Sequence, residues 1–177
     1  TAPPGFYMLF VHNNNGTPSV AKIVQIKDTN AAARFDFDGE WRTNIAVWRP
    51  STGNWTVRYD ATTPTDANTQ FGQNGDIITP GDYDGDGKTD FAIFRPSNSQ
   101  WTIWNSASGN YSYATFGLST DIPVPADFDG DGKTDIAVWR PSDGVWYMLR
   151  SSLGYHAVQW GTNGDKPVNR DFDGDGK

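Results

Sequence analysis

The sequence predicts an all-β protein, a β-propeller built from four-stranded blades of about 45 residues each. Acidic segments recur at regular intervals, and the stretches between them repeat in phase as short runs rich in β-branched and aromatic residues. No apolar pattern with helical spacing occurs, and 19 glycines and 11 prolines interrupt the chain too often for long helices. With 36% hydrophobic residues, the 177-residue chain has enough apolar material for one folded domain.

Four acidic segments set the period of the repeat. They begin at Asp36, Asp82, Asp127 and Asp171, which are 46, 45 and 44 residues apart. We name them loop I (residues 36–44), loop II (82–90), loop III (127–135) and loop IV (171–177). They hold 14 of the 21 acidic residues, so the chain has a net charge of −7 although only seven acids outside the loops stand against its 14 lysines and arginines. Acidity that is this local indicates cation sites rather than general solubility.

Each repeat is expected to contain four strands in a fixed order. The first strand enters the acidic loop, and the second follows the loop in residues 45–51, 91–97 and 136–142. The third strand begins with tryptophan, in residues 55–58, 101–104 and 146–149. The fourth strand ends in an aromatic residue and a glycine, at residues 71–72, 116–117 and 160–161. Short runs bounded by turn residues are typical of antiparallel hairpins.

We therefore expect residues 1–177 to form one β-propeller, or a fragment of one, with whole blades at 30–72, 77–117 and 122–161. Partial blades are expected at both ends, in residues 5–26 and 166–177, and Phe6–Leu9 is a degenerate copy of the third strand. Two interpretations stay open. The chain is a piece of a longer propeller, or its N-terminal strands close a ring with its C-terminal strand. The first is favoured because loop IV stops before its second strand.

Loops II and III have the composition of calcium sites. Carboxylates at loop positions 1, 3, 5 and 9, a backbone carbonyl at position 7 and glycine at position 6 supply the hard oxygens and the sharp turn that Ca²⁺ requires. The expected ligands are Asp82, Asp84, Asp86, the carbonyl of Lys88 and Asp90 in loop II, and Asp127, Asp129, Asp131, the carbonyl of Lys133 and Asp135 in loop III. Magnesium fits less well because it demands near-octahedral geometry and keeps its waters. An EF-hand is excluded, since position 12 is Ile93 or Val138 instead of glutamate.

Loops I and IV are weaker candidates for a cation site. Loop I offers Asp36, Asp38, Glu40 and Asn44, so its carboxylate charge is lower, and Trp41 replaces the glycine at position 6. Loop IV offers Asp171, Asp173 and Asp175 without a ninth position. We expect any ion in either loop to be held more loosely.

The Asp-x-Asp-Gly-Asp-Gly-Lys-Thr-Asp loops, their phase with the repeat and the Phe-Gly turns resemble the FG-GAP/VCBS repeat family, which is related to the head of the integrin α-subunit. The resemblance extends from Phe6 to Lys177. It implies a β-propeller, usually seven-bladed, with calcium in hairpin loops between the first and second strands. It also implies a secreted or surface protein that binds ligands, in some cases as a lectin. The chain departs from the family pattern at Trp41 and Asn44 and in its blade count.

The leading functional hypothesis is a secreted or cell-surface module without catalytic activity that binds a carbohydrate or a cell-surface protein. Eight tryptophans and seven tyrosines supply faces that can stack on sugars. The tryptophans that recur in phase are interpreted as core. Four aromatic residues break the repeat and are the candidate ligand contacts: Trp41, Trp104, Tyr113 and Tyr155. Extracellular calcium is high enough to fill such loops, which favours secretion.

The alternative function is structural or adhesive, as part of a surface assembly, a filament or a larger secreted protein. Open strand edges at the two ends would then support self-association. An enzyme is not expected, because the sequence has no nucleophile elbow, zinc-protease motif or phosphate-binding loop. Nucleic-acid binding is not expected either, because lysine and arginine are scattered. No apolar segment is long enough for membrane insertion.

Overall fold

The computed structural model describes residues 5–9, 22–26, 35–59 and 66–172. Every regular element in these residues is a β-strand, and none is a helix, so the predicted all-β class is confirmed. The chain divides into two compact units, residues 1–30 and 31–177. The first contains an antiparallel hairpin of β1 (Gly5–Leu9) and β2 (Lys22–Ile26), in which Tyr7 pairs with Val24.

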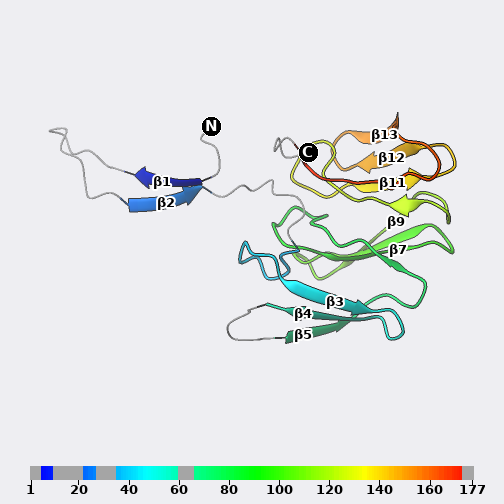
Figure 1. The fold of residues 1–177 in the computed structure, drawn as a ribbon. Helices are drawn as coiled ribbons and strands as arrows, with labels where there is room; N and C mark the ends of the chain where they lie inside the picture. Colours follow the sequence, from blue (N-terminus) through cyan, green and yellow to red (C-terminus); the bar gives the residue numbers. More distant parts are fainter. Residues whose placement is uncertain (1–4, 10–21, 27–34, 60–65, 173–177) are drawn as a thin grey trace. The chain divides into compact units, whose positions relative to one another are not determined.

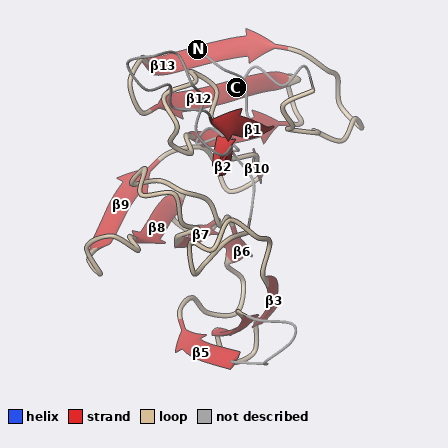
Figure 2. Ribbon diagram, turned by 90° about the vertical axis from the view of Figure 1, so that its left-hand side faces the viewer, coloured by secondary structure: helices blue, strands red, loops and turns tan. Residues whose placement is uncertain are grey.

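The second unit contains three antiparallel sheets that follow one another along the chain (Figures 1 and 2). Sheet I consists of β3 (Ile45–Arg49), β4 (Asn54–Arg58) and β5 (Asp66–Gln70). Sheet II consists of β6 (Ile77–Ile78), β7 (Phe91–Arg95), β8 (Gln100–Trp104) and β9 (Tyr111–Thr115). Sheet III consists of β10 (Ile122–Pro123), β11 (Ile136–Arg140), β12 (Val145–Arg150) and β13 (Gly154–Gln159). Each strand pairs with the next one in sequence.

The register is the same in all three sheets. An aromatic residue of the second strand faces the tryptophan of the third, as Trp48–Trp55, Phe94–Trp101 and Trp139–Trp146. The indole Nε1 of the third-strand tryptophan donates to the carbonyl of the aromatic residue that ends the fourth strand. The pairs are Trp55 to Phe71 at 3.0 Å, Trp101 to Phe116 at 3.1 Å and Trp146 to Trp160 at 3.0 Å. This bond ties each fourth strand to its sheet and gives a polar partner to a ring that packs in the interior.

The recurring aromatic residues form core, as the sequence indicates, where two sheets meet. Ile93 of sheet II packs in one cluster with Trp55 and Phe71 of sheet I. Val138 of sheet III packs likewise with Phe94 and Trp101 of sheet II. Trp55, Phe94, Trp101, Val138 and Trp139 are among the most deeply buried side chains, each at most 2% exposed. The apolar core therefore lies mainly between sheets.

The glycine that follows the aromatic residue at the end of the fourth strand allows the next sheet to pack closely against that strand end. Gly72 has φ 91° and Gly117 has φ 90°, in the left-handed region that disfavours side chains. A Cβ on Gly72 would lie 3.2 Å from Ile93, and one on Gly117 would lie 3.0 Å from Val138. The Phe-Gly dipeptide is thus a contact point between one sheet and the next.

An ion pair closes the connection that leads into sheets II and III. Arg95 at the end of β7 makes a bidentate pair with Asp76, immediately before β6, at 2.7 and 2.8 Å. Arg140 pairs in the same way with Asp121 at 2.9 and 2.9 Å. Both aspartates are buried, at 8% and 4% exposure. The recurring arginine before proline therefore fixes the end of the second strand to the start of the first.

Replacement of Asp76 by asparagine should lower the free energy of unfolding by about 2 kcal/mol, because it leaves the Arg95 guanidinium without a counter-ion in a partly buried position. Urea unfolding followed by tryptophan fluorescence measures the change. The matched control is Asp66→Asn, which breaks the exposed pair with Arg58 and should have a much smaller effect. Equal effects of the two variants would contradict this role of the buried pair.

Candidate metal sites

Loops II and III each connect the short first strand of a sheet to its long second strand. Isolated bridges close their bases, between Gly81 and Asp90 in loop II and between Ala126 and Asp135 in loop III. The position-9 aspartate is consequently the last residue before the second strand. The side chains of Asp90 and Asp135 are buried, at 0% and 1% exposure.

The carboxylates of both loops converge. In loop II one oxygen each from Asp82, Asp84 and Asp86 lies within 4.8 Å of the others. In loop III the converging group is Asp127, Asp129 and Asp135. Among the described residues these are the two groups of acidic side chains with metal-binding spacing. Asp90 and Asp131, although expected as ligands, lie outside the respective groups.

Backbone amides fix the position-1 aspartate at the centre of each loop. Asp82 Oδ1 accepts from Gly85 N at 2.7 Å and its Oδ2 accepts from Gly87 N at 2.8 Å. Asp127 accepts from Gly130 and Gly132 at 2.7 and 2.9 Å. The position-6 glycines need their φ values of 85° and 87° to present these amides. The loop conformation is therefore already set by the chain itself.

A second turn, between the third and fourth strands of the same sheet, also holds these aspartates. Ser106 N donates to Asp90 Oδ1 at 2.7 Å and Ser106 Oγ donates to Asp86 at 2.9 Å. Ser151 N and Oγ donate to Asp135 and Asp131 at 2.7 and 2.5 Å. The sequence prediction missed these serines. Their signal is a constant offset, since each follows the position-5 aspartate by 20 residues.

The electrostatics of both loops favour a bound cation. Burial raises the pKa of Asp90 to about 6 and raises the pKa of Asp82 and Asp135 above the usual value, because removal from water disfavours the charged form. In loop III, Asp129 Oδ1 is buried without a hydrogen-bond partner. A divalent ion would supply both the missing charge and the missing partner. The hard oxygen donors present here fit such an ion.

Loop I makes the same hydrogen bond at position 9 as loops II and III, but through an asparagine instead of an aspartate. Asn44 Oδ1 accepts from Phe37 N at 2.6 Å, which is the bond that Asp90 and Asp135 make in their loops. Its Nδ2 donates to Asp38 Oδ2 at 3.4 Å and to the carbonyl of Tyr59 at 3.3 Å. The amide hydrogens of Asn44 thus point toward a carboxylate that a cation would otherwise neutralise. Trp41 takes φ 61°, which is strained for a residue with a side chain.

The remaining expected ligands are less informative. Glu40 of loop I is exposed, and its amide donates to Asp38 at 3.2 Å. In loop IV, Asp171 is exposed, whereas Asp173 and Asp175 lie outside the described residues. Lys88 and Lys133 occupy position 7 of their loops, where their amides donate to Asp86 and Asp131 at 2.8 and 2.9 Å.

Successive loops are bonded to one another. Thr89 N at position 8 of loop II donates to the carbonyl of Asp36 at 2.7 Å, and Asp36 N donates to Thr89 Oγ1 at 2.9 Å. Thr134 N of loop III donates likewise to the carbonyl of Asp82 at 2.6 Å. The position-1 residues of loops I and II are therefore each held by the loop that follows.

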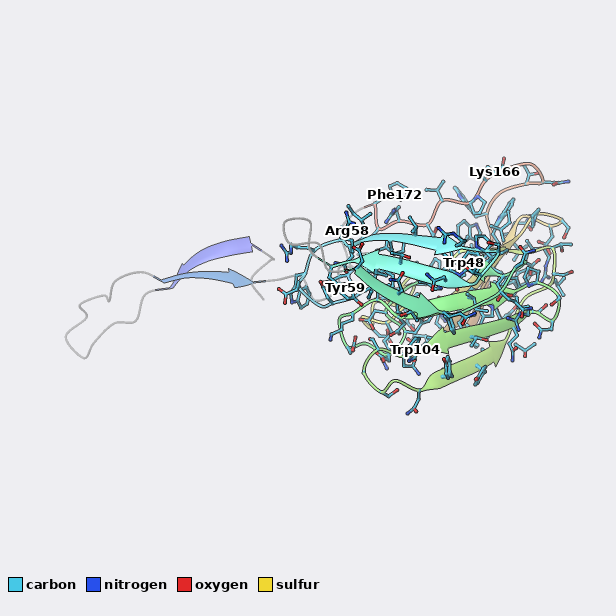
Figure 3. The ribbon with its side chains drawn as sticks, turned by 90° about the horizontal axis from the view of Figure 1, so that it is seen from below. Trp48, Arg58, Tyr59, Trp104, Lys166 and Phe172 are labelled. Atoms are coloured by element: carbon cyan, nitrogen blue, oxygen red, sulfur yellow. The ribbon has the colours of Figure 1, made fainter. Side chains whose placement is uncertain are left out.

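The four aromatic residues expected as ligand contacts come from three sheets or their loops. Trp104 of β8 and Tyr113 of β9 lie in one row of rings through Tyr111, with centroid distances of 5.9 Å for Trp104–Tyr111 and 6.4 Å for Tyr111–Tyr113. Figure 3 labels Trp104 on sheet II. Tyr155 lies on β13 and Trp41 in loop I. The sequence prediction missed Tyr111, which joins the row.

A comparison with protein families gave two matches. The fold and the loops define an all-β repeat with acidic hairpins, and residues 82–138 match the FG-GAP-like repeat. This confirms the resemblance to that family over loop II, loop III and the sheet between them. Residues 1–26 match the Galactose oxidase-like, Early set domain. This is a different domain type from the partial blade that we expect in residues 5–26. The partial blade stays a prediction. Neither the curated proteins nor the solved structures that were compared gave a match.

Restoring the repeat residues should give loop I the ligand set that is expected to bind Ca²⁺ in loops II and III. The double variant Trp41→Gly/Asn44→Asp removes the strained φ and replaces the amide by a carboxylate. Isothermal titration with Ca²⁺ should then count one more ion per chain than in the unmodified protein. An unchanged count would contradict the interpretation that Asn44 takes the place of a cation.

Proposed function

We propose that the chain is a calcium-stabilised, non-catalytic β-repeat module of a secreted or cell-surface protein, and that sheets I to III are blades of a β-propeller. The observation that carries the proposal is the pair of loops with matching aspartates, matching glycines and matching serine anchors. FG-GAP repeats are generally non-catalytic, commonly bind Ca²⁺ and occur in extracellular or surface proteins. Within its described part, the chain contains no helix that could span a bilayer.

Calcium is the ion that suits these loops best. All donors are oxygens, and the loops can offer six or seven of them from flexible carboxylates and a carbonyl, which matches Ca²⁺ better than Mg²⁺. A site with a dissociation constant of about 0.1 mM in about 1 mM Ca²⁺ stabilises the fold by about 1.4 kcal/mol. Cytosolic calcium is too low to fill such a site. An extracellular location therefore follows from a calcium-stabilised fold.

A carbohydrate is the ligand class that the exposed aromatic row supports. Tyr111 is 48% exposed and Tyr113 is 64% exposed, and their rings stack at an interplanar angle of 27°. Trp104 extends the row, and its Nε1 is occupied by the carbonyl of Gly109 at 3.1 Å. Tyrosine faces with polar edges suit the alternation of C–H and hydroxyl groups on a sugar. The proposed sugar site is therefore this row on sheet II.

Calcium should raise the melting temperature of the full chain by about 6–11 °C, because two filled sites would add about 3 kcal/mol. Thermal unfolding with 1 mM Ca²⁺ and with excess chelator measures the shift. Asp127→Asn, which removes the central ligand of loop III, should roughly halve it, whereas Asp66→Asn on β5 should leave it unchanged. A double variant, Asp82→Asn/Asp127→Asn, that keeps the full shift would contradict the assignment of the sites.

Removal of the Tyr113 ring, which is more exposed than the Tyr111 ring, should weaken sugar binding. A glycan array with the full chain in 1 mM Ca²⁺ identifies a binding sugar, and Tyr113→Ala should then reduce its affinity about tenfold, or about 1.4 kcal/mol. The matched control is Tyr155→Ala, which removes a comparably exposed ring from sheet III. Equal losses in both variants, or no array signal at all, would contradict a sugar site on sheet II.

A further inference from the structure

One turn of sheet II contacts both loop II and the exposed aromatic row. We name it the linking turn (residues 105–110), and it joins β8 to β9. Asn105 N donates to the carbonyl of Asn110 at 2.9 Å, and Gly109 N donates to the carbonyl of Asn105 at 2.9 Å. Residues 106–110 are exposed, and a Cβ added to Gly109 would meet nothing within 4 Å. Hydrogen bonds rather than apolar contacts therefore fix the conformation of this turn.

The first half of the linking turn is bound by three carboxylates of loop II. Ser106 N donates to Asp90 Oδ1 at 2.7 Å, and Ser106 Oγ donates to Asp86 Oδ2 at 2.9 Å. Ala107 N donates to Asp84 Oδ2 at 3.1 Å. Asp84 and Asp86 belong to the group of converging carboxylates. A displacement of either carboxylate therefore removes a hydrogen-bond partner from the turn.

The second half of the linking turn holds the aromatic row. The carbonyl of Gly109 accepts from Trp104 Nε1 at 3.1 Å. Tyr111 follows the turn directly and pairs with Trp104 across β8 and β9. Asn105 Nδ2 donates to Ser112 Oγ at 2.6 Å, which ties the turn to the strand that carries the tyrosines. The turn therefore sets how the indole and the first tyrosine ring lie relative to each other.

The converging carboxylates of loop II repel one another unless a cation neutralises them. One oxygen each from Asp82, Asp84 and Asp86 lies within 4.8 Å of the others, a separation at which like charges interact strongly. Asp86 is exposed, so its side chain is free to move into solvent when the repulsion is not balanced. A bound divalent cation removes the repulsion and keeps the carboxylates in the positions that bind the turn.

The corresponding turn of sheet III has more ties of its own. Arg150 Nε donates to the carbonyl of Gly154 at 3.2 Å, a bond that does not involve loop III. Asp129 accepts from both Ser152 N and Ser152 Oγ, at 3.1 and 2.7 Å. Ala107 stands 45 residues before Ser152 in the repeat and has no hydroxyl group. The linking turn of sheet II is therefore the one that depends most on its acidic loop.

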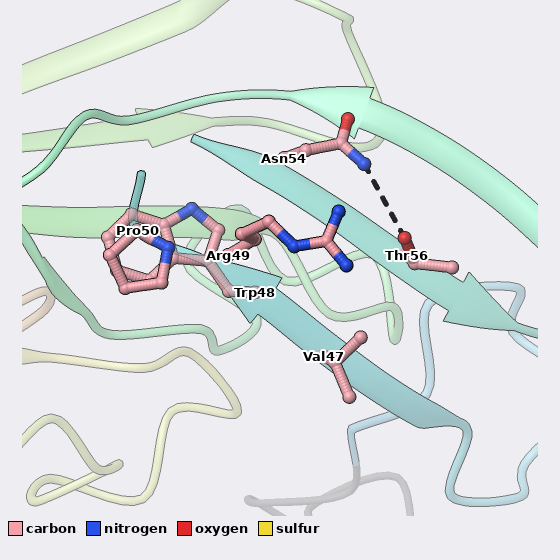
Figure 4. Close-up of a pocket in the computed structure, with 6 residues that line it drawn as sticks. All are labelled: Val47, Trp48, Arg49, Pro50, Asn54 and Thr56. Atoms are coloured by element: carbon pink, nitrogen blue, oxygen red, sulfur yellow. Dashed lines mark hydrogen bonds between the residues drawn. The ribbon is translucent and has the colours of Figure 1, made fainter. Parts of the chain in front are cut away.

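A pocket on sheet I takes its hydrogen bonds from that sheet instead. It has a volume of about 240 Å³ and is lined by Val47, Trp48, Arg49, Pro50, Asn54 and Thr56 (Figure 4). Trp48 Nε1 donates to the carbonyl of Phe71, directly after β5, at 3.1 Å. Asn54 Nδ2 donates to Thr56 Oγ1 on β4 at 3.5 Å. Strand β4 is consequently a suitable internal reference for effects that come from loop II.

We propose that the cation in loop II controls the aromatic row. When loop II is filled, the linking turn is fixed, and Trp104 and Tyr111 are held together as one face for a ligand. When loop II is empty, the turn opens and the face is lost, so ligand affinity on sheet II follows the calcium concentration. This control rests on the proposed function, which supplies the cation in loop II and the ligand for the row.

Hydrogen exchange of the full chain, followed by NMR with 1 mM Ca²⁺ and with excess chelator, tests the control. The amides of Ser106, Ala107 and Gly109 should exchange about tenfold more slowly with calcium, the ratio expected for a dissociation constant of about 0.1 mM. Asp82→Asn should abolish this slowing. Its carboxylate bonds to amides of loop II itself, so the turn keeps its own partners in this variant. Asp127→Asn makes the same change in loop III and should retain the slowing.

The indole hydrogen of Trp104 reports on the row in the same experiment. Because the carbonyl of Gly109 accepts it, its exchange should follow that of the turn amides, and Trp104→Phe identifies its signal. The amide of Val57 on β4 should respond to calcium alike in Asp82→Asn and Asp127→Asn, which separates local opening of the turn from unfolding of the whole chain. No sugar is needed, so the result does not depend on the ligand assignment.

Two outcomes would overturn the proposed control. In the first, the turn amides slow with calcium in Asp82→Asn as much as in Asp127→Asn. In the second, the exchange of the turn is indifferent to calcium although calcium raises the melting temperature of the same chain as expected. A chain whose melting temperature does not respond to calcium at all would instead contradict the calcium-binding function, and the control would fall with it.

Discussion

The burial of two carboxylates at the bases of loops II and III is the constraint that determines the hydrogen bonds within and between the acidic loops. Asp90 and Asp135 are withdrawn from water, so their charge must be balanced by donors or by a cation. The donors to these two carboxylates are the loop amides of Tyr83 and Phe128 and the amides of Ser106 and Ser151 in the opposite turn. These bonds tie the start of the second strand to the turn between the third and fourth strands. The same loops bond to one another through Thr89 and Thr134. The hydrogen bonds that satisfy the buried carboxylates therefore also hold the ends of the strands in place.

Contact between sheets rests on a different pairing, that of a glycine without a side chain and a β-branched residue of the following sheet. Gly72 and Gly117 lie against Ile93 and Val138, and the buried ion pairs close the connecting turns beside them. The apolar surface shared by two neighbouring sheets supplies most of the driving force for folding. Since the core clusters of the described residues join sheet I to sheet II and sheet II to sheet III, stability is distributed over these contacts rather than concentrated in one centre.

The sequence was sufficient to predict the all-β class, the strand segments and the aspartates that converge, because all of these recur with a fixed period. It also indicated that Trp55 and Trp101 are core and that Trp41 occupies a position made for glycine. It did not reveal the serine anchors, since serine is common in turns and only the structure shows Ser106 and Ser151 bonded to distant loops. Tyr111 was missed for a similar reason: it lies on β9 with Tyr113, but its contact with Trp104 forms only across the pairing of β8 and β9.

The bonding of each loop to the next one makes every repeat unit self-contained apart from a single shared boundary. A duplication or deletion of one 45-residue unit in the gene would therefore preserve all boundaries on either side of the change. Loop I, with Trp41 and Asn44, belongs to a unit whose loop departs from the pattern that loops II and III share.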